Sequence, residues 1–388
     1  MKFVDLPAQQ QRIRADLENR LRAVLDHGQY VNGPEIVELE LALARDIGAR
    51  HALACSSGTD ALLMALMAFD IGRGDAVITT PFSFFATVEA ICLVGATPIF
   101  VDIDPKTFNL DPIALERTLV ALSEDDRSSP AVRVLHRQDK LKPRAIIPVD
   151  LFGLPANYDA IRQIARIHGL HIIEDAAQAF GARYHGKHAG TLGDIGCTSF
   201  FPAKPMGCYG DGGMCFTDVD EHANSLKSIR NHGEGQDRYQ HVRTGLNARM
   251  DTLQAAVLLA KRSIFAEECV ARSRNAKRYK DLFGDHPRLT LPSVPEHHES
   301  AWAQYSILAG SKDHRDKIVE RLQIHKIPTA VYYPIPIHLQ VAMGAQGYRK
   351  GDFPVSEDCA DRVFSLPIHP YLNSEEQSRI VEIIKCTI

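Results

Sequence analysis

Residues 199–213, SFFPAKPMGCYGDGG, place one lysine among aromatic residues, prolines and small residues. Exposed, solubilising lysines rarely have such neighbours. Lys204 is therefore a candidate for an amine that stays partly desolvated in order to act as a nucleophile. The alternative is a lysine whose aliphatic stem lies along apolar neighbours. The glycine-dense end of this stretch favours a tight turn beside a ligand, because no helical pattern or Lys-Ser/Thr ending follows that would make it a nucleotide P-loop.

Upstream of this turn, residues 169–178, GLHIIEDAAQ, form a short apolar run that ends in an acid, Asp175. Further apolar runs alternate with helical patterns before it. The candidate strands are 51–55, 76–79, 98–101, 145–149 and 170–174, and the candidate helices are 59–69, 86–94, 112–121 and 157–168. This alternation predicts an α/β fold with a mostly parallel sheet covered by helices. Ligands of such sheets bind beyond the carboxyl ends of the strands, where Asp175 would lie.

The length of 388 residues suits one large domain and one smaller domain. We expect residues 1–250 to form the large α/β/α domain, with an N-terminal helical segment at 8–27 and 34–47. Residues 251–388 would form a long linking helix, from about 251 to 282, and a small C-terminal α+β domain with a strand near 302–308 and helices at 314–325 and 374–385. The polar stretch 123–143 interrupts this organisation, and we expect a partly disordered surface excursion there.

The composition narrows the class of protein. It is 45% hydrophobic and 24% charged, which is enough to bury a large core, and the net charge of -4 argues against nucleic acid as a partner. None of the 8 cysteines forms a C-x-x-C pair, and the 17 histidines include no H-E-x-x-H, so neither a disulfide framework nor a metal site is expected. No apolar run is long enough for a signal core or a membrane span, which predicts a cytoplasmic protein without membrane insertion.

Together these segments indicate a pyridoxal 5'-phosphate (PLP) site. Lys204 would form a Schiff base with the aldehyde, and Asp175 would pair with the pyridinium nitrogen so that the ring can accept electrons. Residues 56–59 lie between a strand and a helix, which suits a phosphate, although an ordinary helix cap is the alternative. Gln178 could reach the ring hydroxyl. An aromatic residue of 81–87, PFSFFAT, could stack on the ring, although most aromatic residues at such positions belong to the core.

Nine short motifs, taken as an ordered set, resemble the DegT/DnrJ/StrS family of PLP-dependent nucleotide-sugar aminotransferases. The resemblance covers essentially the whole chain. It implies the aspartate aminotransferase fold, fold type I. The motifs lie at 33–35, 57–62, 101–103, 174–178, 199–204, 210–213, 247–251, 333–334 and 365–367.

The family resemblance implies a role for each matching residue. Lys204 would be the cofactor lysine and proton shuttle, Asp175 the pyridinium partner and Gln178 the contact to the ring oxygen. L-Glutamate would donate the amino group by a ping-pong mechanism through pyridoxamine phosphate.

The same resemblance assigns the phosphate and the ring face. Ser199 and the backbone of Gly58 and Thr59 would hold the phosphate, and Phe84 would take the stacking position. Asn247 would reach the phosphate from the partner subunit, so the resemblance implies an obligate homodimer with shared active sites.

Within the family, the chain is most similar to the group that acts on UDP-2-acetamido-2-deoxy-3-oxo-D-glucuronate in bacterial polysaccharide biosynthesis, such as that of lipopolysaccharide O-antigen. Arg249 and Tyr333 would contact the nucleotide-sugar. Tyr332 stands where that group has histidine and is a further substrate-binding candidate. The runs that carry this similarity are 27–30, 108–112, 205–210 and 328–336.

Several alternatives stay open from the sequence. Another 3-keto or 4-keto nucleotide-sugar is the main one, because a few kcal/mol from one or two contacts decide between near-isosteric sugars. A sugar dehydratase of the same fold would carry histidine in place of Lys204. A non-catalytic PLP-binding regulatory protein would be expected to lack part of the set formed by the lysine, the aspartate and the phosphate turn.

Overall fold

The computed structural model describes residues 1–135, 141–237 and 239–387. Its centre is a seven-stranded sheet of order β1-β9-β8-β5-β4-β2-β3, in which β9 alone runs antiparallel to its neighbours. The expected α/β fold with a mostly parallel sheet is therefore confirmed. The strands are β1 (His51–Cys55), β2 (Asp75–Thr79), β3 (Thr97–Phe100), β4 (Lys142–Ile146), β5 (His171–Asp175), β8 (Ile195–Ser199) and β9 (Gly213–Thr217).

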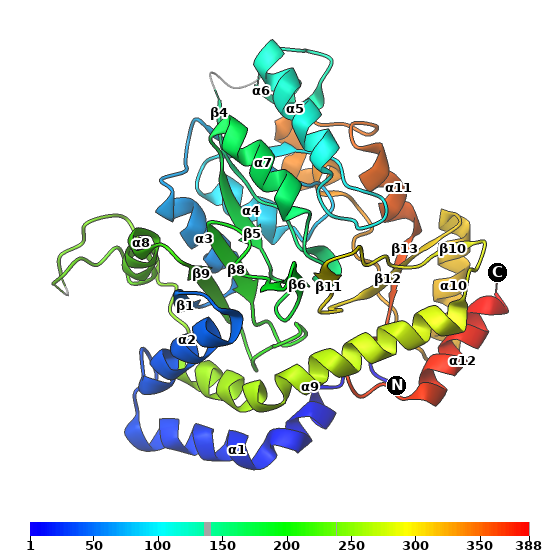
Figure 1. Ribbon diagram of the computed structural model, residues 1–388, viewed down its shortest axis with the longest axis horizontal. Coiled ribbons are helices and arrows are strands. Elements are labelled where there is room, and N and C mark those ends of the chain that lie inside the picture. Colours follow the sequence, from blue (N-terminus) through cyan, green and yellow to red (C-terminus); the bar gives the residue numbers. More distant parts are fainter. Residues whose placement is uncertain (136–140, 238, 388) are drawn as a thin grey trace.

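Helices cover both faces of this sheet (Figure 1). Val77 of β2 packs into the cluster shared with α3, α4 and α8, whereas the next residue, Ile78, packs into the cluster shared with α5, α6 and α7. Strand residues buried on both faces explain the nearly continuous apolar runs in the sequence. The helices are α1 (Leu6–His27), α2 (Pro34–Ile47), α3 (Gly58–Ala68), α4 (Ala86–Leu93), α5 (Pro112–Glu124), α6 (Pro130–Leu135), α7 (Tyr158–His168), α8 (Asp220–Arg230) and α9 (Thr252–Phe283).

The long helix α9 leads from the large sheet to a second, smaller sheet (Figure 1). This sheet has the order β10-β12-β13 and its own apolar core against α10 and α12. The division of the chain at residue 250 stays a prediction, and residues 337–353 pack into the core of the large sheet. The elements are β10 (Leu289–Thr290), β12 (Tyr305–Ala309), α10 (Lys312–Ile324), η2 (Ile337–Leu339), η3 (Val341–Gln346), α11 (Pro354–Arg362), β13 (Val363–Leu366) and α12 (Ser374–Lys385).

A short turn and a small three-stranded ribbon complete the unit built on the large sheet. The turn η1 (Leu151–Gly153) follows β4, and a three-stranded ribbon joins β6 (Arg183–Tyr184) to β7 (Lys187–His188) and to β11 (His298–Glu299). Since β11 comes from the second half of the chain, this ribbon connects the two units.

The expectation for 123–143 was wrong over much of its length. Helix α5 continues to Glu124, and α6 follows at Pro130–Leu135 with Ala131, Val132 and Val134 buried. Charged residues flank the pattern Ala-Val-x-Val, so the sequence shows no clear helical periodicity for this short helix. Strand β4 begins at Lys142, three residues before the predicted start at 145. The prediction began too late because the first residues of the strand are polar. The rest of the predicted excursion, 136–140, lies outside the described residues.

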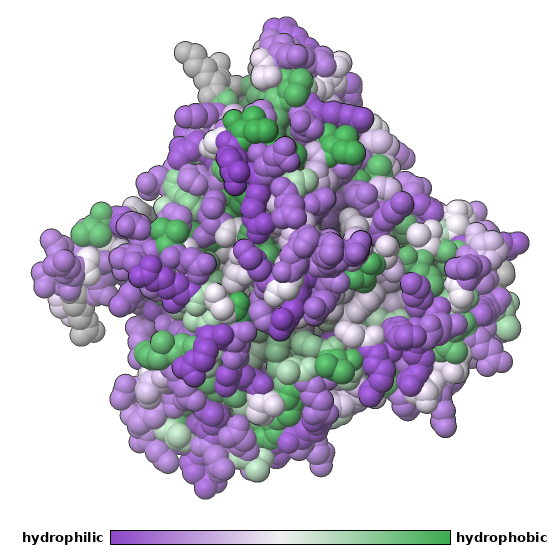
Figure 2. Space-filling model, in the orientation of Figure 1, coloured by the Kyte–Doolittle hydropathy of each residue, from purple (hydrophilic) through white to green (hydrophobic). Residues whose placement is uncertain are grey.

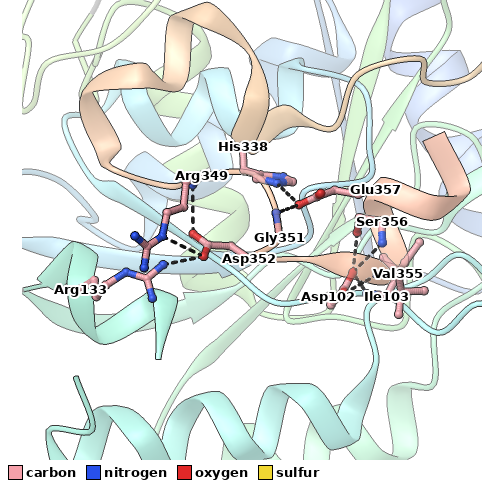
Figure 3. A network of polar contacts seen from close by, with 10 residues as sticks. All are labelled: Asp102, Ile103, Arg133, His338, Arg349, Gly351, Asp352, Val355, Ser356 and Glu357. Carbon is pink, nitrogen blue, oxygen red and sulfur yellow. Dashed lines mark hydrogen bonds and ion pairs between the residues drawn. The ribbon is translucent and has the colours of Figure 1, made fainter. Parts of the chain in front are cut away.

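Figure 3 shows how α6 and the start of α11 are attached to the rest of the molecule. The carboxylate of Asp102 accepts hydrogen bonds from the backbone amides of Val355 and Ser356, both at 2.9 Å, and so caps α11. Arg133 of α6 forms an ion pair with Asp352 at 2.6 Å. Helix α6, which was not predicted, therefore holds the segment that packs beside the edge strand β3.

Hydrophilic residues cover most of the face seen in Figure 2, and apolar residues are scattered among them. Within the part of the chain that the structure describes, no helix is long and apolar enough to cross a membrane.

Candidate active site

The carboxyl ends of the neighbouring strands β5 and β8 bring the predicted residues together. Asp175 ends β5 and lies opposite Cys197 of β8 in the parallel register. Strand β8 ends at Ser199, and the turn that carries Lys204 follows it directly. Asp175 therefore lies at the carboxyl end of its strand as expected, whereas the strand β8 that precedes Lys204 was not predicted.

Asp175 is buried and hydrogen-bonded at both carboxylate oxygens. The hydroxyl of Thr87 donates to Oδ2 at 2.7 Å, and the backbone amide of Ala177 donates to Oδ1 at 3.2 Å. Burial raises the pKa of Asp175, while these two bonds and the charge of Lys204 act in the opposite direction. The result is a buried carboxylate held in one orientation, which suits a partner for a cationic ring nitrogen.

Thr87 is a candidate site residue that sequence reasoning missed. It lies in the first turn of α4, and its hydroxyl also shares a 3.0 Å hydrogen bond with the hydroxyl of Ser83. Both residues belong to the run 81–87, of which only the aromatic residues were predicted to contribute to the site. Two buried hydroxyls four residues apart in an apolar helix start were the signal that could have found them.

Lys204 has the electrostatics of a nucleophile. Burial lowers its pKa to about 8, and the nearby charge of Asp175 opposes that effect. An amine with such a pKa gives up its proton close to neutral pH, unlike an exposed lysine. Its backbone amide donates to the carbonyl of Phe201 at 2.9 Å, so the residue sits in a closed turn.

Gln178 joins the acid strand to the second half of the chain. Its amide nitrogen donates to the hydroxyl of Tyr333 at 3.1 Å, and its oxygen accepts from the backbone amide of Phe152 at 2.9 Å. Tyr333 is thereby held against the site, and burial raises its pKa. The side chain of Phe84 is 57% exposed, and its ring centroid lies 6.2 Å from that of Tyr333, at the open side of the site.

The turn between β1 and α3 meets the end of β8. Ser57 caps α3 by accepting the amide of Asp60, which leaves the amides of Gly58 and Thr59 at the helix start. A Cβ on Gly58 would lie 2.7 Å from the Cβ of Ser199, so only glycine allows this approach. The helix start and the Ser199 hydroxyl thus meet at one place, as a phosphate site requires.

The structure does not bring Asn247 or Arg249 into contact with Lys204 of the same chain. Asn247 is exposed, and both residues line an open cavity of about 400 Å³ together with Ser56 and Gly210. The carbonyl of Ala248 accepts the amide of Ser56 at 3.0 Å, so this segment lies beside the turn before α3.

Tyr332 is half-buried, and its ring lies 6.3 Å from that of Phe3. The N-terminal residues 4–6, together with His369 and Tyr371, also line a small cavity with Lys204. Sequence reasoning did not place the first residues of the chain near the site, because no local pattern encodes such a contact.

These residues fit PLP. A lysine of lowered pKa, a buried carboxylate with fixed hydrogen bonds and a glycine turn that a Cβ would fill meet at one edge of the sheet. Lys204 would hold the aldehyde carbon, Asp175 the ring nitrogen and the turn at Gly58 the phosphate.

Comparisons with known proteins agree with this chemistry. Residues 11–385 match the model of the DegT/DnrJ/EryC1/StrS aminotransferase family. The chain is 43% identical to the UDP-2-acetamido-2-deoxy-3-oxo-D-glucuronate aminotransferase of Pseudomonas aeruginosa over 96% of each chain. A DegT DnrJ EryC1 StrS aminotransferase from Brucella abortus has a similar structure, with a TM-score of 0.92, 44% identity and coverage of 100% of this chain and 99% of that one. The ntda protein of Bacillus subtilis, solved with the cofactor PMP, gives a TM-score of 0.86 at 30% identity and covers 99% of this chain and 83% of that one.

Proposed function

The chain belongs to the DegT/DnrJ/EryC1/StrS aminotransferase family, and on that basis we propose that it uses PLP to transfer the amino group of L-glutamate to a keto nucleotide-sugar. The observation that supports the cofactor most directly is that Lys204, whose pKa burial lowers to about 8, lies close enough to the buried carboxylate of Asp175 for each to influence the charge of the other. The regulatory alternative would be expected to have lost part of this set, and each member is present.

The cofactor supplies the electron sink that makes the Cα–H bond of the donor acidic. Asp175 favours the protonated ring nitrogen on which that sink depends, and Thr87 fixes the carboxylate at 2.7 Å. With a pKa lowered to about 8, the Nζ of Lys204 loses its proton more readily than an exposed lysine, so its neutral form would accept the Cα proton of the donor and would deliver a proton to the sugar carbon in the second half of the reaction. Gln178 would hold the ring hydroxyl while staying bonded to Tyr333.

We propose UDP-2-acetamido-2-deoxy-3-oxo-D-glucuronate as the acceptor, which gives the 3-amino sugar. The support is the 43% identity to the Pseudomonas aeruginosa enzyme that is named for this substrate. The nucleotide-sugar would contact Tyr332, Tyr333 and Arg249. Arg249 supplies a guanidinium that suits the carboxylate of a uronic acid. Other 3-keto or 4-keto sugars are the alternative acceptors.

A homodimer is part of this proposal. Asn247 is exposed and away from Lys204 in its own chain, which is the arrangement expected of a residue that serves a neighbouring site. Large apolar residues are also exposed near the start of the chain and at the site, where a second copy would bury them. They include Leu25, Tyr30, Val31, Val37, Leu41, Phe84 and Phe201. Eight free cysteines are consistent with work in a reducing cytoplasm.

Transfer of a nitrogen label tests this function. The 3-keto sugar is incubated with the protein, PLP and L-glutamate that carries ¹⁵N at its amino group. Mass spectrometry then measures the mass of the nucleotide-sugar product. We expect a labelled 3-amino sugar, and no product from Lys204→Ala. Label transfer to a 4-keto sugar alone would keep the enzyme class and reject the proposed acceptor, whereas transfer to no keto nucleotide-sugar would reject the function.

A further inference from the structure

A second buried lysine contacts the turn that carries Lys204. This turn is closed by hydrogen bonds from the amide of Lys204 to the carbonyl of Phe201 at 2.9 Å and from the amide of Cys208 to the carbonyl of Phe200 at 2.7 Å. The carbonyl of Gly207 accepts a hydrogen bond from Nζ of Lys261 at 2.5 Å. Helix α9 therefore contacts the turn through Lys261, and Gln254 of the same helix accepts the backbone amide of Tyr209 at 2.9 Å just after the turn.

The surroundings of Lys261 are unusual for a lysine. The residue is 2% exposed, and its ammonium group lies 4.3 Å from the centroid of the Tyr209 ring. Among the described residues, no carboxylate forms an ion pair with it, although Cys208 and, after it, Glu268 favour its charge. Burial lowers its pKa to about 8. An ammonium group kept in such a place is costly, so the contacts that it makes must offset the cost.

The Gly207 end of the turn has no room to adjust. A Cβ on Gly207 would lie 2.4 Å from the carbonyl oxygen of Pro202 and 2.5 Å from that of Phe201. The backbone at both ends of the turn is thus in close contact. A displacement at Gly207 would be transmitted to the residues before Lys204 rather than absorbed locally.

We propose that Lys261 is a positioning residue of the reaction: it fixes the turn of Lys204 through the carbonyl of Gly207. This inference rests on the proposed function, because it assigns Lys261 to the orientation of the cofactor lysine. Lys261 touches neither substrate nor cofactor. Its hydrogen bond and its contact with Tyr209 anchor the turn to α9, the helix that also leads to the small sheet.

The test measures how fast Lys204 of the folded apoprotein attaches PLP. The adduct is fixed with borohydride at successive times and located by peptide mass mapping. We compare Lys261→Met with Lys261→Arg, which keeps a donor and a cation. Lys277→Met is the matched control, because Lys277 is exposed on the same helix and pairs with Asp281. We expect attachment about tenfold slower in Lys261→Met, or about 1.4 kcal/mol in the barrier, rescue in Lys261→Arg and no change in Lys277→Met.

A second readout separates positioning from bulk stability. The pH midpoint of the visible band of the loaded protein should shift in Lys261→Met and stay in place in Lys277→Met. Attachment and midpoint both as in the wild type, with only a lower Tm, would overturn the proposal. If Lys261→Met does not fold, Lys261→Gln serves instead, because its shorter neutral side chain removes the cation. Failure of the wild type to attach PLP at Lys204 would reject the proposed function instead.

Discussion

Replacing Lys204 by methionine should stabilise the apoprotein at neutral pH. The pKa of Lys204 is lowered from 10.5 to about 8 by burial. Each pKa unit corresponds to about 1.4 kcal/mol, so the buried charge costs at most about 3.5 kcal/mol of folding free energy. The side chain keeps some exposure, and solvent screening reduces the effect, so we expect a gain of about 1–3 kcal/mol at pH 7.

The pH dependence of this gain has a definite sign. Below about pH 8 both the folded and the unfolded state hold the lysine proton, and the full cost is present. Between about pH 8 and 10.5 the folded state has lost the proton while the unfolded state still binds it, so the wild type gains stability as the pH rises. The advantage of Lys204→Met should therefore shrink across this interval.

Urea unfolding of the apoprotein, followed by circular dichroism at pH 7, 8, 9 and 10, measures this difference. Any gain from the apolar methionine is independent of pH, so the change with pH is the quantity that matters. The exposed Lys277→Met should differ from the wild type by less than about 0.5 kcal/mol throughout. A difference that stays constant from pH 7 to 10 would refute the reasoning about the buried amine.

Three further predictions concern residues around the site. Thr87→Val removes the 2.7 Å hydrogen bond to Asp175, the proposed partner of the ring nitrogen. It should lower kcat about tenfold and shift the acidic limb of the pH profile upward, and Thr87→Ser should restore both; steady-state kinetics measured across pH test this prediction. Burial and the neighbouring Glu174 raise the pKa of Asp150, which favours its uncharged form, so the neutral replacement Asp150→Asn should change the free energy of unfolding by less than about 1 kcal/mol. Glu174 accepts hydrogen bonds from three backbone amides, so Glu174→Gln should cost about 2–4 kcal/mol; urea titrations measure both changes. Gly58→Ala places a Cβ 2.7 Å from Ser199 and should cost about 1–3 kcal/mol and weaken PLP binding in fluorescence titrations; unchanged affinity would contradict the phosphate turn.

The fold was predictable from the sequence wherever a pattern was local and strong. Buried strands such as β1 and β5 appear as uninterrupted apolar runs, and α9 as a long helical pattern, so their ends agree with the prediction within a few residues. Helix α6 was missed because it has only six residues and flanking charges. The predicted bounds of strand β4 were too late in the chain, because tertiary pairing with β2 overrides the polar character of its first residues.

The site divides in the same way. Lys204 and Asp175 stand out because each is a charged residue in an apolar setting, and the chemistry of PLP pairs a lysine with an acid. Thr87, Tyr333 beside Gln178, and Lys261 beneath Gly207 depend on contacts between segments far apart in the chain. No periodicity or local motif encodes those contacts, so only the three-dimensional structure shows them.

The most direct test of the whole account is the visible spectrum of the PLP-loaded protein during addition of L-glutamate and then of the keto-sugar. The account predicts a visible band in the wild type that bleaches with L-glutamate and returns with UDP-2-acetamido-2-deoxy-3-oxo-D-glucuronate. A loaded protein whose band bleaches with no amino acid would contradict the assignment of Lys204 and Asp175 to amino-group transfer.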